Sequence, residues 1–148
     1  MAEIYNSNAW TQNQSVSIAA DTNGTTIDLQ GYNGCFFAVH VGASGSVDAS
    51  NFLELSIQHA DESGVTDTAD TFAACADADL TNTVTGTLAT TGCFAKINDA
   101  AEDDATYFTE YIGRKRFVRV RFDEDGTFGA ADCVVIIAKT TPVYGPAN

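Results

Sequence analysis

The chain has 148 residues, of which 45% are apolar and 18% charged, and its formal net charge at pH 7 is −13. This length is typical of a single domain with one core. The negative charge argues against sequence-independent nucleic-acid binding and against an anionic membrane surface, since both need a cationic surface. No apolar run approaches the roughly 20 residues of a membrane span, and the first residues do not resemble a signal peptide. We therefore expect a protein that is made in the cytoplasm.

The first 14 residues are polar and show no periodicity. Apart from Met1 and two alanines, their apolar side chains are Ile4, Tyr5 and Trp10, and Trp10 is the single Trp of the chain. One interpretation is a frayed terminus. The other is an N-terminal arm (residues 1–14) whose aromatic side chains anchor on a neighbouring subunit or on another protein.

Two strands are predicted next. Residues 16–20 and 25–30 flank Asn23-Gly24, a dipeptide typical of the turn of a β-hairpin. Residues 35–41 follow as an apolar run, which predicts a strand buried on both faces inside a sandwich.

Residues 52–59 alternate between apolar and polar side chains, which predicts a half-buried strand. Leu53, Leu55 and Ile57 are expected to face inward, and Glu54, Ser56 and Gln58 outward. Residues 65–91 are rich in Thr, Ala, Asp and Gly and predict extended loops with one or two short strands. Residues 93–97 then predict a further strand.

Five of the seven Lys and Arg residues fall in one segment, residues 107–122. From residue 116 onward the segment alternates, and this predicts a strand near the centre of the sheet. Two interpretations of its charge remain open. Arg119 and Arg121 pair with carboxylates on a neighbouring strand, or Arg114, Lys115 and Arg116 at the strand entrance contact an acidic patch on another subunit.

Residues 133–138 predict another strand buried on both faces, and residues 140–148 predict an extended C-terminal tail that contains Pro142, Tyr144 and Pro146. Strands recur every ten to fifteen residues without a helical period. The sequence therefore predicts an all-β fold, a single antiparallel β-sandwich or jelly-roll-like barrel with extended N- and C-terminal arms.

The four cysteines match no zinc-site spacing. Cys35 and Cys133 each begin an apolar strand and are expected to be free buried thiols. Cys75 and Cys93 bracket a loop-like segment and are the better candidates for a disulfide, which would form after release into an oxidising medium.

Catalytic and cofactor motifs are not found. There is no Gly-x-Ser-x-Gly elbow, no dinucleotide fingerprint and no Walker loop. Asp123-Glu-Asp-Gly126 resembles part of a calcium loop, but Arg121 stands where that loop needs an oxygen ligand. A Cys–His enzyme would require Cys35 or Cys133 to lie beside His40 or His59. We expect no enzyme, no cofactor and no metal site.

Two strings carry a resemblance. Thr26-Ile-Asp-Leu-Gln-Gly-Tyr-Asn33 and Tyr111-Ile-Gly-Arg-Lys-Arg-Phe-Val-Arg-Val120, together with a closing aliphatic strand and a Pro-containing tail, are similar to small virion proteins of tailed bacteriophages. These proteins are encoded in the head-gene region, and some are capsid decoration (cement) proteins.

The resemblance implies a mechanical function on the outer surface of the capsid. Its partners would be the major capsid protein and further copies of the chain, as a homotrimer by analogy with other shell-stabilising proteins. The arm (Ile4, Tyr5, Trp10) and the tail (Pro142, Tyr144, Pro146) would reach neighbouring molecules. No direct contact with nucleic acid or membrane is expected.

Two rival functions stay open. The first is a head-completion, neck or tail protein of the same virion. The second is a β-sandwich module that binds carbohydrate or a host surface, which would need an exposed aromatic platform. Trp10, Tyr107 and Tyr111 are the candidates for such a platform.

Overall fold

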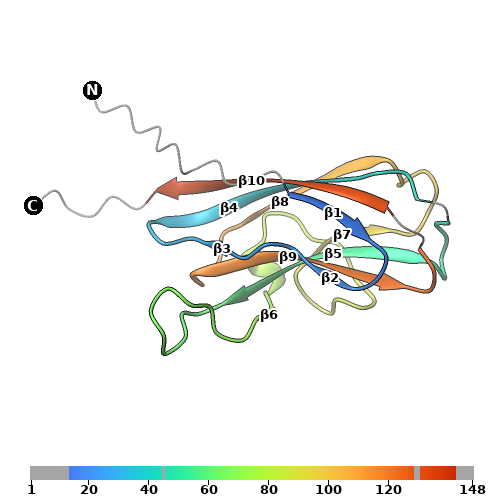
Figure 1. Cartoon of the computed structure of the whole chain (residues 1–148). Helices are drawn as coiled ribbons and strands as arrows, with labels where there is room; N and C mark the ends of the chain where they lie inside the picture. The colour runs from blue at the N-terminus through green and yellow to red at the C-terminus, as the bar shows by residue number, and fades with distance from the viewer. Residues whose placement is uncertain (1–13, 45, 129–130, 143–148) are drawn as a thin grey trace, which may run out of the picture.

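The computed structural model describes residues 14–44, 46–128 and 131–142 and consists of two antiparallel sheets packed face to face (Figure 1). Sheet A is the upper sheet in Figure 1, with strand order β1-β10-β4-β8. Its strands are β1 (Gln14–Ile18), β4 (Tyr32–Val41), β8 (Ala105–Tyr111) and β10 (Ala131–Pro142).

Sheet B lies below it, with β9 and β5 at its centre. The short β2 and β3 both pair with β9, while β6 and β7 both pair with β5. Its strands are β2 (Thr22–Asn23), β3 (Ile27–Asp28), β5 (Phe52–Ala60), β6 (Ala73–Ala74), β7 (Cys93–Ile97) and β9 (Phe117–Asp125). One turn of 3₁₀-helix, η1 (Asp77–Asp79), follows β6.

The strand order is that of a jelly roll, because the chain passes repeatedly from one sheet to the other. This confirms the predicted fold class. The predicted hairpin of residues 16–20 and 25–30 is wrong, since β1 pairs with β10 in sheet A whereas β2 and β3 pair with β9 in sheet B. Asn23-Gly24 therefore lies on a crossover between the sheets. The amide of Gly24 donates to the carbonyl of Val120 on β9 at 2.8 Å.

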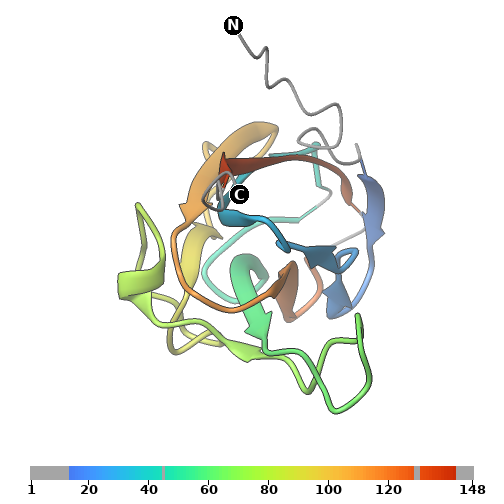
Figure 2. The ribbon, with the colours of Figure 1, turned by 90° about the vertical axis from the view of Figure 1, so that its left-hand side faces the viewer.

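The predicted central strand is confirmed. β9 lies between β5 and the short strands β2 and β3. Val118, Val120 and Phe122 are buried in the core between the sheets, where they meet Leu55 and Ile57 of β5. Figure 2 views the molecule from the end at which β10 finishes and shows the two sheets on opposite sides of this core.

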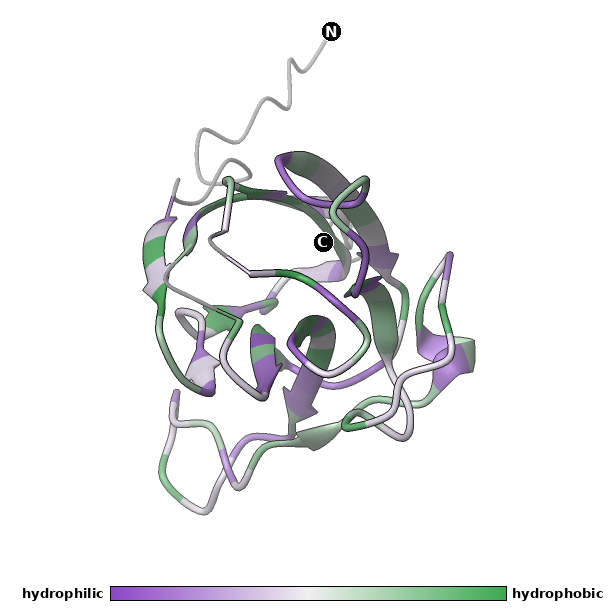
Figure 3. Cartoon of the chain, turned by 90° about the vertical axis from the view of Figure 1, so that its right-hand side faces the viewer, coloured by the Kyte–Doolittle hydropathy of each residue, from purple (hydrophilic) through white to green (hydrophobic). Residues whose placement is uncertain are grey.

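Sheet A is not buried on both faces, which corrects the prediction for residues 35–41 and 133–138. Alternate side chains of β4 and β10 face outward, and Phe36, Val134 and Ile136 are exposed. Figure 3 shows the hydrophobic and hydrophilic bands that alternate along the strands. The strand ends also differ from the prediction, because Gln14 already belongs to β1 and β10 continues to Pro142.

The outer side of sheet B is covered by a loop. Contrary to the prediction that Glu54 faces solvent, its side chain is fully buried and accepts the backbone N–H groups of Thr87, Leu88 and Ala89 at 2.5 to 2.9 Å. Nζ of Lys96 also lies 3.1 Å from Oε1 of Glu54 and forms an ion pair with the carboxylate. Burial raises the pKa of Glu54, but these donors outweigh it and the net pKa is lowered. The carboxylate thus fastens the loop to the sheet.

All four cysteines are buried free thiols, which corrects the predicted disulfide. Cys75 belongs to the core between the sheets. Cys93 pairs with Ser56 and lies near Glu54, on the outer side of sheet B. The sheet therefore separates the two sulfur atoms. Burial raises the pKa of each of the four thiols to about 12, so the thiolate form is suppressed at neutral pH.

Candidate contact surfaces

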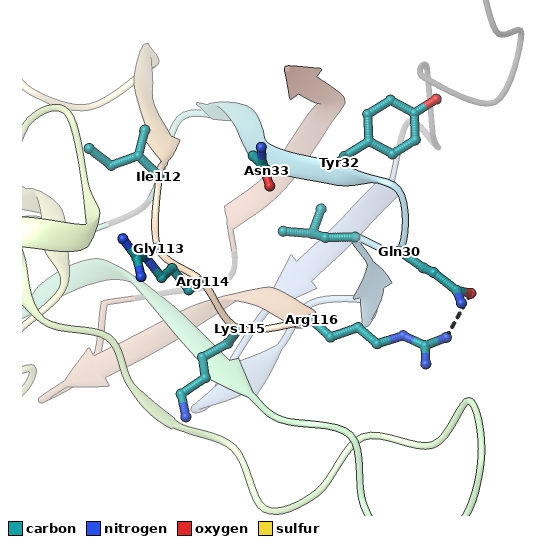
Figure 4. A pocket seen from close by; sticks show the side chains of 9 residues that line it. Gln30, Tyr32, Asn33, Ile112, Gly113, Arg114, Lys115 and Arg116 are labelled. Atoms are coloured by element: carbon teal, nitrogen blue, oxygen red, sulfur yellow. Dashed lines mark hydrogen bonds between the residues drawn. The ribbon is translucent and has the colours of Figure 1, made fainter. Parts of the chain in front are cut away.

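Two segments that are far apart in the sequence meet in a pocket of about 580 Å³ at one end of the sandwich. One is the turn between β3 and β4, and the other is the β8–β9 loop (Figure 4). We call this surface the end pocket. Its lining residues are Leu29, Gln30, Tyr32, Asn33, Ile112, Gly113, Arg114, Lys115 and Arg116.

The first wall is a tight turn. The amide of Tyr32 donates to the carbonyl of Leu29 at 2.8 Å, and Gly31 between them has a φ of +83°. A positive φ at this position is what a type II turn requires, and glycine adopts it without strain. Asp28 stabilises the turn by accepting the amide of Gln30 at 2.9 Å.

The second wall is held by Tyr111, whose side chain is fully buried. Its hydroxyl accepts the amide of Lys115 at 3.1 Å and lies 3.0 Å from Nδ1 of His59. Burial raises the pKa of Tyr111 to about 12 and lowers that of His59. The phenol therefore keeps its proton at neutral pH, and its hydroxyl and Nδ1 of His59 share one hydrogen bond. A Cβ at Gly113 would overlap the Tyr111 ring, so glycine lets the loop pack against it.

Most cations near the end pocket are paired within the molecule. Arg116 bonds Asp28 at 2.7 Å and Glu62 at 2.6 Å and also pairs with Asp67, while Lys115 pairs with Asp61. The hydrogen bond from Arg116 lowers the pKa of Asp28.

Arg114 differs from these neighbours. It is exposed and has no ion-pair partner among the described residues. Arg114 is one of the three cations that the sequence placed at the entrance of the basic strand, and its side chain is exposed to solvent. It stands on the rim beside Ile112, which is 52% exposed.

The outward cations of β9 are satisfied on sheet B. Arg121 pairs with Asp21 at 2.8 Å and with Asp123 at 2.7 Å, so its partners lie within the molecule. They are not on a neighbouring strand as predicted, because Asp21 precedes β2 and Asp123 belongs to β9 itself. Arg119 differs, because it donates to the amide oxygen of Gln58 and stacks on the ring of Phe72 at 4.1 Å. Both guanidinium groups are therefore bonded to groups within the same molecule.

Several predicted contact residues lie outside the described residues. These are Ile4, Tyr5 and Trp10 of the arm and Tyr144 and Pro146 of the tail. Pro142 is the last residue of β10 and pairs with Tyr32, a lining residue of the end pocket. β10 therefore ends at the edge of this pocket.

A second surface is the apolar outer face of sheet A, which the sequence did not predict. Exposed fractions are 55% for Phe108, 43% for Ile136, 39% for Val134 and 37% for Phe36. Ala38 lies between Ile136 and Phe108 in the ladder, so the side chains form one patch across three strands. We call it the sheet A face.

The structure also places the side chains that were considered for a carbohydrate-binding platform and for a Cys–His enzyme. Tyr111 is buried and Tyr107 is half-buried, with its hydroxyl donating to the carbonyl of Glu102, so these two do not form an exposed platform. His40 hydrogen-bonds Thr106 and His59 hydrogen-bonds Tyr111, and among the described residues neither imidazole hydrogen-bonds a cysteine. Within the described ranges no group of three His, Cys, Asp or Glu is arranged to hold a metal ion. No helix in the described part is long and apolar enough to span a membrane.

The chain has a distant structural likeness to one part of a known enzyme. No family model and no curated protein matches the chain. The fold is similar to a Clostridium thermocellum structure, the N-terminal endo-1,4-beta-D-xylanase 10B with its CBM22-1 and GH10 modules bound to xylohexaose. The TM-score is 0.47 and the identity 12%, over 95% of this chain and 28% of that chain. The chain thus spans little more than a quarter of the length of the xylanase chain that it matches.

Proposed function

We propose that the chain is a structural protein of a tailed-bacteriophage virion, a capsid decoration protein that binds the outer surface of the major capsid protein lattice. The observation that carries this proposal is the convergence of residues 26–33 and 111–120 on the end pocket. These are the two strings that resemble phage virion proteins. Asp28 and Arg116 are 88 positions apart, yet they are joined by an ion pair beside the pocket.

The rim of the end pocket has the features of a docking site. Ile112 offers an apolar anchor, and Arg114 offers a cation on a chain whose net charge is −13. Arg is enriched among the residues that dominate binding energy at interfaces. The partner surface is expected to be acidic, and a charge complementary to Arg114 would set the register of docking.

The proposed stabilisation of the capsid follows from the linkage between binding of this protein and expansion of the lattice. A protein that binds the expanded lattice, and not the unexpanded one, stabilises the expanded state by an amount that grows with the logarithm of its free concentration. Contacts between adjacent copies add avidity without any new contact to the shell. We propose a homotrimer in which the arm (Ile4, Tyr5, Trp10) and the tail reach neighbouring molecules.

The test is addition of purified protein to heads that lack it. Wild type is expected to bind at on the order of hundreds of copies per head and to raise the temperature at which the heads release DNA. Arg114→Glu and Ile112→Ser should weaken binding, whereas Leu88→Ser, at a residue 41% exposed on the loop that covers the outer side of sheet B, should not. Binding at about six or twelve copies would instead indicate a ring at the neck. No binding would contradict the proposal.

A further inference from the structure

The first half of β8 is an open edge of sheet A. β8 is the outermost strand on its side of the sheet, since its one neighbour in the strand order is β4 (Figure 2). Backbone N–H and C=O groups point alternately to the two sides of a strand. The carbonyl of Glu110 accepts the amide of Thr81 at 3.0 Å, and the amide of Ile112 donates to the carbonyl of Asp79 at 2.8 Å. The even-numbered residues of this segment therefore direct their backbone groups away from β4.

These backbone groups are paired at one end of β8 and open at the other. Residues 79–82 cover the edge at the C-terminal end of β8, and the covering segment then leaves it, because the amide of Val84 donates to the carbonyl of Cys93 in sheet B at 2.9 Å. Thr106 and Phe108 lie beyond this cover and are exposed. Among the described residues, the backbone N–H and C=O groups of these two make no hydrogen bond. An edge of this kind is a template for a further strand.

The side chains at this edge also suit an added strand. Phe108 is 55% exposed and ends the apolar row of the sheet A face, which runs through Ala38 to Ile136. A strand added beside β8 would place a side chain against the Phe108 ring. On the opposite face, Tyr107 packs against the core and its hydroxyl donates to the carbonyl of Glu102, so β8 is held in place without a partner.

The charge around the edge indicates the chemistry of the partner. The loop that precedes β8 carries four carboxylates, those of Asp99, Glu102, Asp103 and Asp104. Among the described residues their one ion pair joins Asp104 to Nε2 of His40 at 3.5 Å, and the Asp104 side chain is 71% exposed. A second copy carries the same carboxylates and the same net charge of −13, which disfavours pairing of two copies at this edge. A basic segment is attracted to it instead.

We propose that the open edge of β8 binds an extended, basic segment of a partner protein, which adds to sheet A as one further strand. The segment exchanges hydrogen bonds with the backbone groups of Thr106 and Phe108, covers the Phe108 ring with an apolar side chain and pairs a basic side chain with Asp104. Main-chain bonds give such a complex its affinity, and alternate side chains give it specificity. The site is separate from the end pocket, where Arg114 favours an acidic partner, so the inference goes beyond the proposed function.

The test uses a peptide of alternating basic and apolar residues, acetyl-Lys-Val-Lys-Val-Lys-Val-Lys-amide. Fluorescence anisotropy of a labelled form measures its binding to the full chain. In an added strand alternate N–H groups face β8, so N-methylation of one alternate set, either the Val amides or the Lys amides, should raise the Kd at least about ten-fold. N-methylation of the other set should leave the Kd nearly unchanged. The peptide with Glu in place of Lys should not bind, because the edge is acidic.

Two variants at one position test the edge in the protein itself. Thr106→Pro removes a backbone donor that no described group uses, and proline is tolerated in an edge strand at such a position. Thr106→Val keeps the donor and loses the hydroxyl that bonds His40. The first should weaken binding of the Lys/Val peptide at least about ten-fold, and the matched second variant should bind it like wild type. Arg114→Glu, at the end pocket, should also bind it like wild type, so this test and the head-binding test can fail independently.

Three results would overturn the inference. The first is absence of binding by the unmethylated Lys/Val peptide. The second is an equal effect of the two N-methylated sets, which would show that no strand is added, and this readout stays decisive if Thr106→Pro does not fold. The third is self-association of the chain without peptide that is lost in Thr106→Pro, which would assign the edge to a second copy.

Discussion

The hydroxyl of Tyr111 lies 3.0 Å from Nδ1 of His59 and joins the two sheets, since Tyr111 ends β8 in sheet A and His59 lies on β5 in sheet B. The same hydroxyl accepts the amide of Lys115 at 3.1 Å. One phenol therefore holds the sheets together and shapes the β8–β9 loop that lines the end pocket.

Tyr111→Phe removes both hydrogen bonds and leaves buried polar groups unpaired. We expect the free energy of unfolding to fall by about 1–3 kcal/mol, measured by urea denaturation. Tyr107→Phe is the matched control, because Tyr107 is half-buried and its single bond is to the carbonyl of Glu102. Equal losses in the two variants would contradict the role given to Tyr111.

His59 is expected to make stability depend on pH near neutrality. Burial is the largest cause that lowers its pKa below the ordinary 6.5, although Asp79 opposes it. The unfolded chain then binds more protons than the folded chain just below pH 6.5. Stability therefore decreases as the pH falls through this range and levels off below the folded pKa. Thermal unfolding between pH 7.5 and 5.5 should show this slope, which His59→Gln should reduce and His40→Gln, at a more exposed site, should leave in place.

Glu54→Gln should loosen the loop that covers sheet B. Glutamine places a donor against the backbone donors and cannot balance Lys96, so we expect a loss of roughly 3 kcal/mol. Hydrogen exchange at the amides of Thr87, Leu88 and Ala89 should accelerate. Asp132→Asn, at an exposed position, should change neither quantity. Because the pKa of Glu54 is lowered, its contribution is present above pH 4.5 and is lost as the pH falls through the folded pKa.

The cysteines should behave as four buried free thiols. Intact-mass measurement after alkylation in denaturant is expected to count four thiols, and alkylation of the folded protein at pH 7.5 should be slow, because burial raises each pKa to about 12. A count of two would restore the disulfide between Cys75 and Cys93 that the sequence suggested.

Local pattern predicted the strands better than it predicted their partners. The alternation around Val118 and Val120 identified β9 correctly, because period two follows from strand geometry alone. The Asn23-Gly24 hairpin was wrong, because in a jelly roll the two flanking segments belong to different sheets. Turn chemistry reports a local bend, whereas strand pairing depends on the whole topology.

The surfaces were less predictable than the strands, for a related reason. Apolar runs such as residues 35–41 indicate that both sides of a strand avoid water, but they do not say which chain covers the outer side. The runs therefore predict Phe36 and Ile136 in the core, whereas both lie on the sheet A face. The basic segment was recognised, yet its partners Asp28, on β3, and Glu62, in the loop after β5, are far away in the sequence and spacing does not bring them together.

A reconstruction of the virion tests the central proposal most directly. The account predicts density with the shape of this jelly roll on the outside of the shell, repeated on the order of hundreds of times where capsomers meet, with the end pocket turned toward the capsid protein. Density confined to the neck or tail, or a shell without such density that is no more fragile, would contradict it.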